Sequence, residues 1–211
     1  MKILSVSDTV NGLLYSPQIK NRFKDVDLVI SCGDLPFYYL EYIISMLNAP
    51  LYYVHGNHTC REEQGHKHSR DSVWGGINLH RKCKRDASGL LLAGIEGSLQ
   101  YNQGPYQYSQ SEMWSMVLSL MPTLFMNKVM YGRYLDIFVT HAAAWHIHDT
   151  QDLPHQGIKA FCWLHRVFKP AYHLHGHIHI YRQDTTRETR VNDTRVINVF
   201  NYRELEVETR R

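Results

Sequence analysis

Residues 172–179 read YHLHGHIH, and this stretch carries the clearest structural signal in the chain. Its first four residues match a buried strand in length and in aromatic and branched content, and Gly176 follows where the chain must turn. In an extended segment, residues two apart point the same way, so His177 and His179 lie on one side. The stretch predicts a strand that delivers two imidazoles beyond its carboxyl end.

The same arrangement, an apolar run followed by polar residues, occurs four more times. These runs end in Asp8, in Gly33-Asp34, in Gly56-Asn57-His58 and in Thr140-His141. In open α/β sheets, ligands bind beyond the carboxyl ends of the strands, so five such ends predict one cluster of carboxylate, amide and imidazole groups. Oxygen and nitrogen donors without a thiolate suit Mn, Fe, Ni, Zn or Mg.

The rest of the chain alternates apolar runs with helical patterns, which predicts an α/β domain. Strands are expected at 2–7, 28–32, 51–55, 90–95, 134–140, 172–175 and 196–200. Helices are expected at 39–47, at 110–130 with a break at Pro122, and from Ile158 to before Pro170. Segments 59–71 and 97–109 are expected to be loops; the Tyr and Gln side chains of 101–108 either line a substrate entrance or cover the core.

Length and composition restrict the class of protein. The 211 residues, at about 150 per domain, predict one domain over 1–211. With 44% hydrophobic and 20% charged residues, a disordered or fibrous chain is excluded. The net charge of +3 is too small to favour long nucleic acid as a partner, because such binding depends on many basic contacts to phosphates. The basic cluster from Arg81 to Arg85 is interpreted as a solvated turn.

Cysteine spacing and hydropathy indicate the compartment. The four cysteines form no C-x-x-C pair, which argues against a disulfide framework or a thiolate zinc site. The first apolar run meets Asp8 too soon for a signal peptide, and no apolar run reaches about 18 residues. We therefore expect a soluble cytoplasmic protein with reduced cysteines and no membrane partner.

Taken in order, the five motifs resemble those of the calcineurin-like metallophosphoesterases. That family's pattern is D-x-H, G-D, G-N-H-[DE], a lone H and G-H-x-H, and the resemblance runs from Asp8 to His179. It implies a four-layered α/β/β/α sandwich with two divalent ions, Mn²⁺ first among them. In that arrangement Asp34 bridges the ions; Asn57, His141 and His177 complete one site, and Asp8 and His179 hold the other.

The resemblance also implies a reaction. A centre of this kind hydrolyses phosphate esters by attack of a metal-bound hydroxide, and we slightly favour small phosphodiesters over phosphomonoesters. His58, next to the ligand Asn57, would protonate the departing alkoxide or stabilise charge on the phosphate. His58 is therefore the candidate catalytic residue.

Two positions depart from the family pattern. Val10 stands where the family has a ligand histidine, and Thr59 stands where it has an acidic residue. His148 is the candidate replacement ligand, because its loop leaves the strand end that carries His141; a water molecule is the alternative. The departures keep open a second class of function, a scaffold or regulatory protein without turnover, although the retained His58 favours an enzyme. Histidines outside the motifs, among them His155, are interpreted as surface or packed residues.

Overall fold

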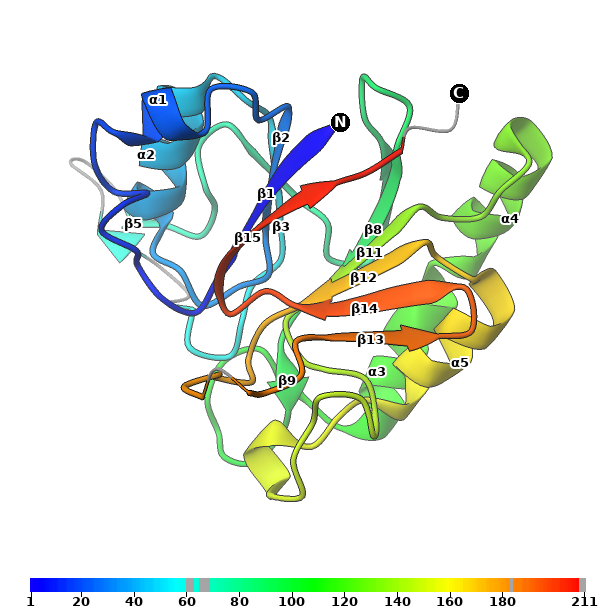
Figure 1. Ribbon diagram of the computed structural model, residues 1–211. Helices are drawn as coiled ribbons and strands as arrows, with labels where there is room; N and C mark the ends of the chain where they lie inside the picture. The colour runs from blue at the N-terminus through cyan, green and yellow to red at the C-terminus, as the bar shows by residue number, and fades with distance from the viewer. Residues whose placement is uncertain (60–62, 65–68, 183, 209–211) are drawn as a thin grey trace.

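Two β-sheets pack face to face in the centre of the molecule, and helices cover the outer face of each sheet (Figure 1). This computed structural model describes residues 1–59, 63–64, 69–182 and 184–208. The first sheet has the order β15-β1-β2-β3-β6. Its strands are β1 (Lys2–Ser7), β2 (Leu28–Ser31), β3 (Leu51–Tyr53), β6 (Gly76–Asn78) and β15 (Asn201–Glu206).

The second sheet has the order β13-β14-β12-β11-β8-β7. Its strands are β7 (Lys82–Arg85), β8 (Leu91–Ile95), β11 (Ile137–Thr140), β12 (Tyr172–His175), β13 (Glu188–Val191) and β14 (Thr194–Asn198). In both sheets the central strands are parallel, and β15, β7 and β13 add antiparallel edges. The two groups of carboxyl ends therefore carry the loops that follow β1, β2, β3, β11 and β12.

Alternation along the strands divides the core into layers. Leu28 and Ile30 of β2 face the second sheet, where Ile137 and Val139 of β11 meet them. Val29 between them faces the opposite way, toward the helices. Burying each such side chain contributes about 1.5–3 kcal/mol to the free energy of unfolding. The predicted four-layered α/β/β/α sandwich is confirmed.

The helices lie at the two flanks of Figure 1. α1 (Ile19–Arg22) and α2 (Phe37–Leu47) cover the first sheet, and α3 (Gln110–Ser119), α4 (Met121–Tyr131) and α5 (Lys159–Phe168) cover the second. The expected break at Pro122 is confirmed, because Pro122 lies in the first turn of α4, where its missing N–H has no cost. A capping box between Ser109 and Glu112 starts α3.

Some local predictions need correction. The cluster from Arg81 to Arg85 is not only a turn, since Lys82–Arg85 forms β7 at the edge of the second sheet. Charged side chains suit an edge strand, because they discourage pairing with another chain. Segment 97–109 contains the short strands β9 (Ser98–Leu99) and β10 (Gln107–Tyr108). Segment 59–71 lies partly outside the described residues; its described part includes β4 (Glu63–Gln64) and β5 (Ser69–Arg70). Within the described ranges, no helix is long and apolar enough to cross a bilayer.

A pair of buried histidines joins strand β12 of the second sheet to helix α5. Thr140 donates its hydroxyl to the carbonyl of Ala142 (2.6 Å), so Nε2 of His173 must donate to the Thr140 oxygen (2.8 Å). Nδ1 of His173 then accepts from Nε2 of His165 (2.9 Å). Burial lowers the pKa of His165 to about 4, and burial together with its histidine neighbours lowers the pKa of His173 well below the ordinary value. Both imidazoles are neutral in the folded protein.

This pair predicts acid sensitivity. Because the unfolded chain takes up protons near the ordinary histidine pKa of about 6.5 and the folded chain does not, stability falls as pH drops below that value. Between about pH 7 and about pH 5 we expect a loss of about 2 kcal/mol from His165 and a further loss in the same direction from His173, measured by urea unfolding. His165→Gln keeps a donor for His173 without a titrating ring and should remove part of that loss.

The exposed His146 provides the matched control. Its φ of 59° favours asparagine as the replacement, and His146→Asn should leave the pH dependence of stability unchanged. Equal pH dependence in the wild-type protein and His165→Gln would contradict the assignment.

Candidate metal centre

The candidate residues are placed by turns at the strand ends. Asp8, Asp34 and His177 each follow a parallel strand and have left-handed backbones, with φ of 66°, 56° and 67°. Such values are uncommon outside glycine and are often found at functional sites. Backbone hydrogen bonds join the turns in pairs: the Asp8 N–H donates to the Gly33 carbonyl (3.2 Å), and the Gly176 N–H donates to the His141 carbonyl (3.0 Å).

Two of the motif glycines are required by close approach. A β-carbon at Gly56 would overlap the carboxylate of Asp34 and lie 2.7 Å from the ring of His141. A β-carbon at Gly176 would overlap the hydroxyl of Ser7 and lie 2.7 Å from the Asp8 carboxylate. The loops can therefore converge only because these positions have no side chain.

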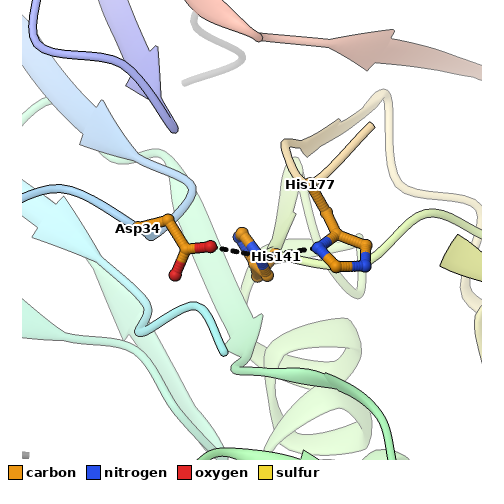
Figure 2. Close-up of side chains that lie close together, drawn as sticks. All are labelled: Asp34, His141 and His177. Carbon is orange, nitrogen blue, oxygen red and sulfur yellow. Dashed lines mark hydrogen bonds and ion pairs between the residues drawn. The ribbon is translucent and has the colours of Figure 1, made fainter. Parts of the chain in front are cut away.

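Three side chains meet around Nε2 of His141. Asp34 Oδ2 lies 3.2 Å from this atom, Asn57 Oδ1 lies 3.0 Å from it and His177 Nδ1 lies 3.1 Å from it. Figure 2 shows Asp34 and His177 on opposite sides of the His141 ring. His141 comes from the end of β11, His177 from the turn after β12, and the other two from the turns after β2 and β3. Of the residues that the structure describes, Asp34, His141 and His177 form the one group with metal-ligand spacing.

Backbone carbonyls determine which ring nitrogens carry hydrogen. Nδ1 of His141 lies 2.8 Å from the Cys32 carbonyl, and Nε2 of His177 lies 2.8 Å from the Pro154 carbonyl. A carbonyl only accepts, so these two nitrogens are the donors. The nitrogens that face the centre, His141 Nε2 and His177 Nδ1, therefore carry electron pairs when the rings are neutral. This hydrogen bond from the second ring nitrogen is typical of histidines that bind metal.

The charges around the centre are unbalanced. Burial would raise the pKa of Asp34, but the charge and hydrogen bond of His141 and the His58 backbone N–H lower it to about 2. Burial would lower the pKa of His141, but Asp34 and then Asp8 raise it to about 9. Burial and the neighbouring His141 lower the pKa of His177 to about 4. Asp34 thus favours a proton on His141, and a proton on His141 disfavours one on His177. The nitrogen and oxygen donors of these groups fit a divalent cation.

Asp8 and His179 lie beside this group. The Asp8 side chain is only 1% exposed, and its two oxygens accept the His177 backbone N–H at 3.0 and 3.2 Å. His179 Nε2 lies 3.8 Å from Asp8 Oδ1, while its Nδ1 contacts the Tyr181 hydroxyl (2.9 Å). The His179 side chain is 45% exposed, so this part of the centre is more open. Val10 offers no donor atom.

His148, the predicted replacement ligand, lies outside the group around His141, and its ring contacts other residues. Its Nδ1 lies 2.9 Å from Nε2 of His175, and its Nε2 lies 2.9 Å from the hydroxyl of Thr189 on β13. A tight turn between Ala144 and Ile147 follows the strand end, and His148 itself has a φ of 63°. Both ring nitrogens are thereby bound to other residues.

The His58 side chain is exposed at the centre, while its backbone N–H donates to Asp34 Oδ1 (2.8 Å). Thr59 does not orient the ring. Its hydroxyl accepts from the Gly56 N–H (2.9 Å) and the Asp34 N–H (3.3 Å), so it stabilises the turn. Thr59 thus organises the ligand loops where the family has an acidic residue.

A groove of about 430 Å³ opens next to His179. It is lined by Thr150, Asp152, His155, Ile178, His179 and Tyr181. His155 lies in the short 3₁₀ turn Leu153–His155, hydrogen-bonds through Nδ1 to Asp152, and places its ring 5.1 Å from that of His177. Sequence reasoning missed this histidine because its segment carries no motif, and only the tertiary fold brings it to the centre.

Comparisons with known proteins agree with this architecture. The calcineurin-like phosphoesterase family matches residues 1–181. TT1561 of Thermus thermophilus is similar in fold, with a TM-score of 0.61 and 14% identity over 95% of this chain and 89% of that one.

Two further structures share the fold. Phosphopantetheinyl hydrolase of Mycobacterium tuberculosis has a TM-score of 0.54 and 14% identity over 94% of this chain and 88% of that one. GAP50, the anchor in the inner membrane complex of Plasmodium, has a TM-score of 0.50 and 14% identity, covering 94% and 70%. No curated protein sequence matches significantly. The family match over residues 1–181 and the shared fold together show that this chain belongs to the calcineurin-like phosphoesterases.

Proposed function

We propose that this chain is a metal-dependent phosphoesterase that hydrolyses small phosphate esters, with a slight preference for phosphodiesters. The observation that carries the proposal is the convergence of Asp34, Asn57 and His177 on Nε2 of His141. Asp34, Asn57 and His177 direct electron pairs at one point, which favours positive charge there: a proton on His141, whose pKa is raised to about 9, or a bound cation. A divalent metal ion is the cation that this donor set suits.

We assign one ion to Asp34, Asn57, His141 and His177, and a second ion to Asp8, Asp34 and His179. Mn²⁺ is the proposed metal, with Fe, Ni, Zn and Mg as alternatives that take the same donors. When bound, such ions supply Lewis acidity that activates water and neutralises phosphate charge. Because Val10 offers no ligand and His179 is half-exposed, we expect the second ion to be held less tightly.

Other residues of the chain have separate tasks in this proposal. His58 donates a proton to the departing alkoxide, and its exposed side chain leaves it free to reach the substrate. The groove beside His179 receives the organic part of the ester, since its volume of about 430 Å³ suits a compact group. The net charge of +3 favours such a substrate over long nucleic acid, and we propose no membrane partner.

A scaffold or regulatory role is the second candidate, and Val10 and Thr59 favour it because neither supplies the group that the family pattern has there. Two measurements on one preparation separate the candidates. Metal content is determined by mass spectrometry, and an aryl phosphodiester and an aryl phosphomonoester are assayed with and without Mn²⁺.

The phosphoesterase proposal expects about two ions per chain after loading and turnover that Mn²⁺ stimulates. His146→Asn, which removes an exposed histidine outside the centre, serves as the control for adventitious metal. A folded protein that shows no turnover in excess Mn²⁺ would favour the scaffold.

A further inference from the structure

The hydroxyl of Tyr101 lies one amide group away from the metal centre. Asn57, which presents Oδ1 to His141, donates its Nδ2 hydrogen to the Tyr101 hydroxyl oxygen at 3.0 Å. Tyr101 is half-buried and follows β9, so it reaches the centre from a loop outside the five motifs. Residues 101–108 therefore contribute at least one side chain that contacts the centre.

The loop that carries Tyr101 is held by its own side chains. Gln107 Oε1 accepts the backbone N–H groups of Tyr101 and Asn102, each at 3.1 Å. Gln107 also donates from Nε2 to Asn102 Oδ1 at 2.6 Å, and the same oxygen accepts the Gly104 N–H at 2.7 Å. These bonds involve none of the proposed ligands. Tyr101 is thus positioned independently of the centre.

The hydrogen bond to the tyrosine oxygen bears on the orientation of the Asn57 amide. An amide group has a similar shape in its two flipped orientations, but only one orientation places the carbonyl oxygen toward His141. A tyrosine hydroxyl can donate or accept, so Tyr101 favours that orientation when its own O–H is donated elsewhere and its oxygen is left to accept from Nδ2. The flipped amide would direct an NH₂ group, which cannot bind a cation, into the centre.

The proton of the Tyr101 hydroxyl remains to be placed. The oxygen already accepts from Asn57, and the hydrogen bonds within the described residues give its proton no protein acceptor. A tyrosine hydroxyl beside a cation site is well suited to donate to an anionic oxygen, because a bond to a charged acceptor is stronger than one between neutral groups.

We propose that Tyr101 is a dual-purpose residue of this centre: it orients Asn57 toward the metal and donates its O–H to an oxygen of the bound phosphoryl group. The inference rests on the proposed function for the identity of its ligand. It assigns substrate recognition to a loop that the family motifs do not include. No bond is made or broken, so the role is one of positioning and binding.

The test measures two binding constants without turnover. Free Mn²⁺ is counted by electron paramagnetic resonance, and inorganic phosphate binding to the manganese-saturated protein is followed by ³¹P relaxation. Tyr101→Phe should weaken Mn²⁺ binding about tenfold, as expected for the loss of a group that orients a ligand. It should also weaken phosphate binding about tenfold at saturating Mn²⁺, through the lost charge-assisted hydrogen bond.

Tyr108→Phe provides the matched control, because Tyr108 is in the same loop and donates its hydroxyl to Glu96 (2.7 Å) rather than toward the centre. It should change neither constant. Unchanged constants in Tyr101→Phe, or equal changes in the two variants, would overturn the proposal. A change in the Mn²⁺ constant alone would overturn the phosphate contact.

Failure of the proposed function is recognised separately. A wild-type protein that binds Mn²⁺ and phosphate but hydrolyses no ester would contradict the phosphoesterase assignment and leave the two constants of Tyr101→Phe measurable. A wild-type protein that binds no Mn²⁺ would overturn both proposals before any variant is compared.

Discussion

Asp34→Asn should remove most of the bound metal and reduce phosphoesterase turnover about a thousandfold. The Asp34 carboxylate contributes the negative charge next to His141, and its second oxygen accepts the His58 backbone N–H. Asparagine has nearly the same shape but no charge, and its NH₂ group cannot bind a cation. Metal content and turnover, measured on the same preparation, should fall together.

Asp193→Asn is the matched control, because Asp193 is an exposed carboxylate paired with Lys169, and both residues lie outside the five motifs. It should retain both metal and turnover. Circular dichroism shows whether Asp34→Asn is folded. A folded Asp34→Asn protein that keeps full metal content would contradict the bridging assignment.

His58→Ala is expected to lower turnover by about 10²–10⁴-fold while metal content stays at the wild-type level. Metal content should not change because His58 contacts Asp34 through its backbone N–H, which alanine retains, and the His58 side chain is exposed. The assay should compare two aryl esters. The loss should be smaller for the more acidic phenol, since a good leaving group needs less help from a proton donor.

The comparison is made against His146→Asn, which should behave as wild type. If His58→Ala loses equal activity on both esters, proton donation is not its role. If it keeps wild-type turnover, the catalytic assignment of His58 is wrong.

The strands that the sequence predicts best are those with the most apolar surroundings. β1 matches its predicted bounds, and β2, β3, β8, β11, β12 and β14 lie where apolar runs indicate strands. The missed edge strands β7, β13 and β15 carry alternating polar or charged residues, a pattern that a loop also shows. Their conformation depends on pairing with a central strand rather than on their own composition.

The candidate metal centre also contains both residues that the sequence predicts and residues that it does not. Asp34, Asn57, His141 and His177 come together as the ordered motifs indicate, because the carboxyl ends of parallel strands bring them there. The carbonyls of Cys32 and Pro154, which contact His141 and His177, could not be predicted from the sequence. Every residue has a backbone carbonyl, and only the fold shows which carbonyls lie next to the ligand histidines. His148 shows the opposite case, since its neighbourhood in sequence suggested a place at the centre, whereas its Nδ1 contacts His175.

The candidate ligands are divided between the two sheets. Asp8, Asp34 and Asn57 follow strands of the first sheet, whereas His141, His177 and His179 follow strands of the second. An ion bound by these groups would link the two sheets, so the sheets could not separate unless the ion dissociated. At a free ion concentration one hundred times the dissociation constant, metal binding adds about 2.7 kcal/mol to the free energy of unfolding. The concentration of free metal ion would then affect the equilibrium stability of the folded protein as well as its activity.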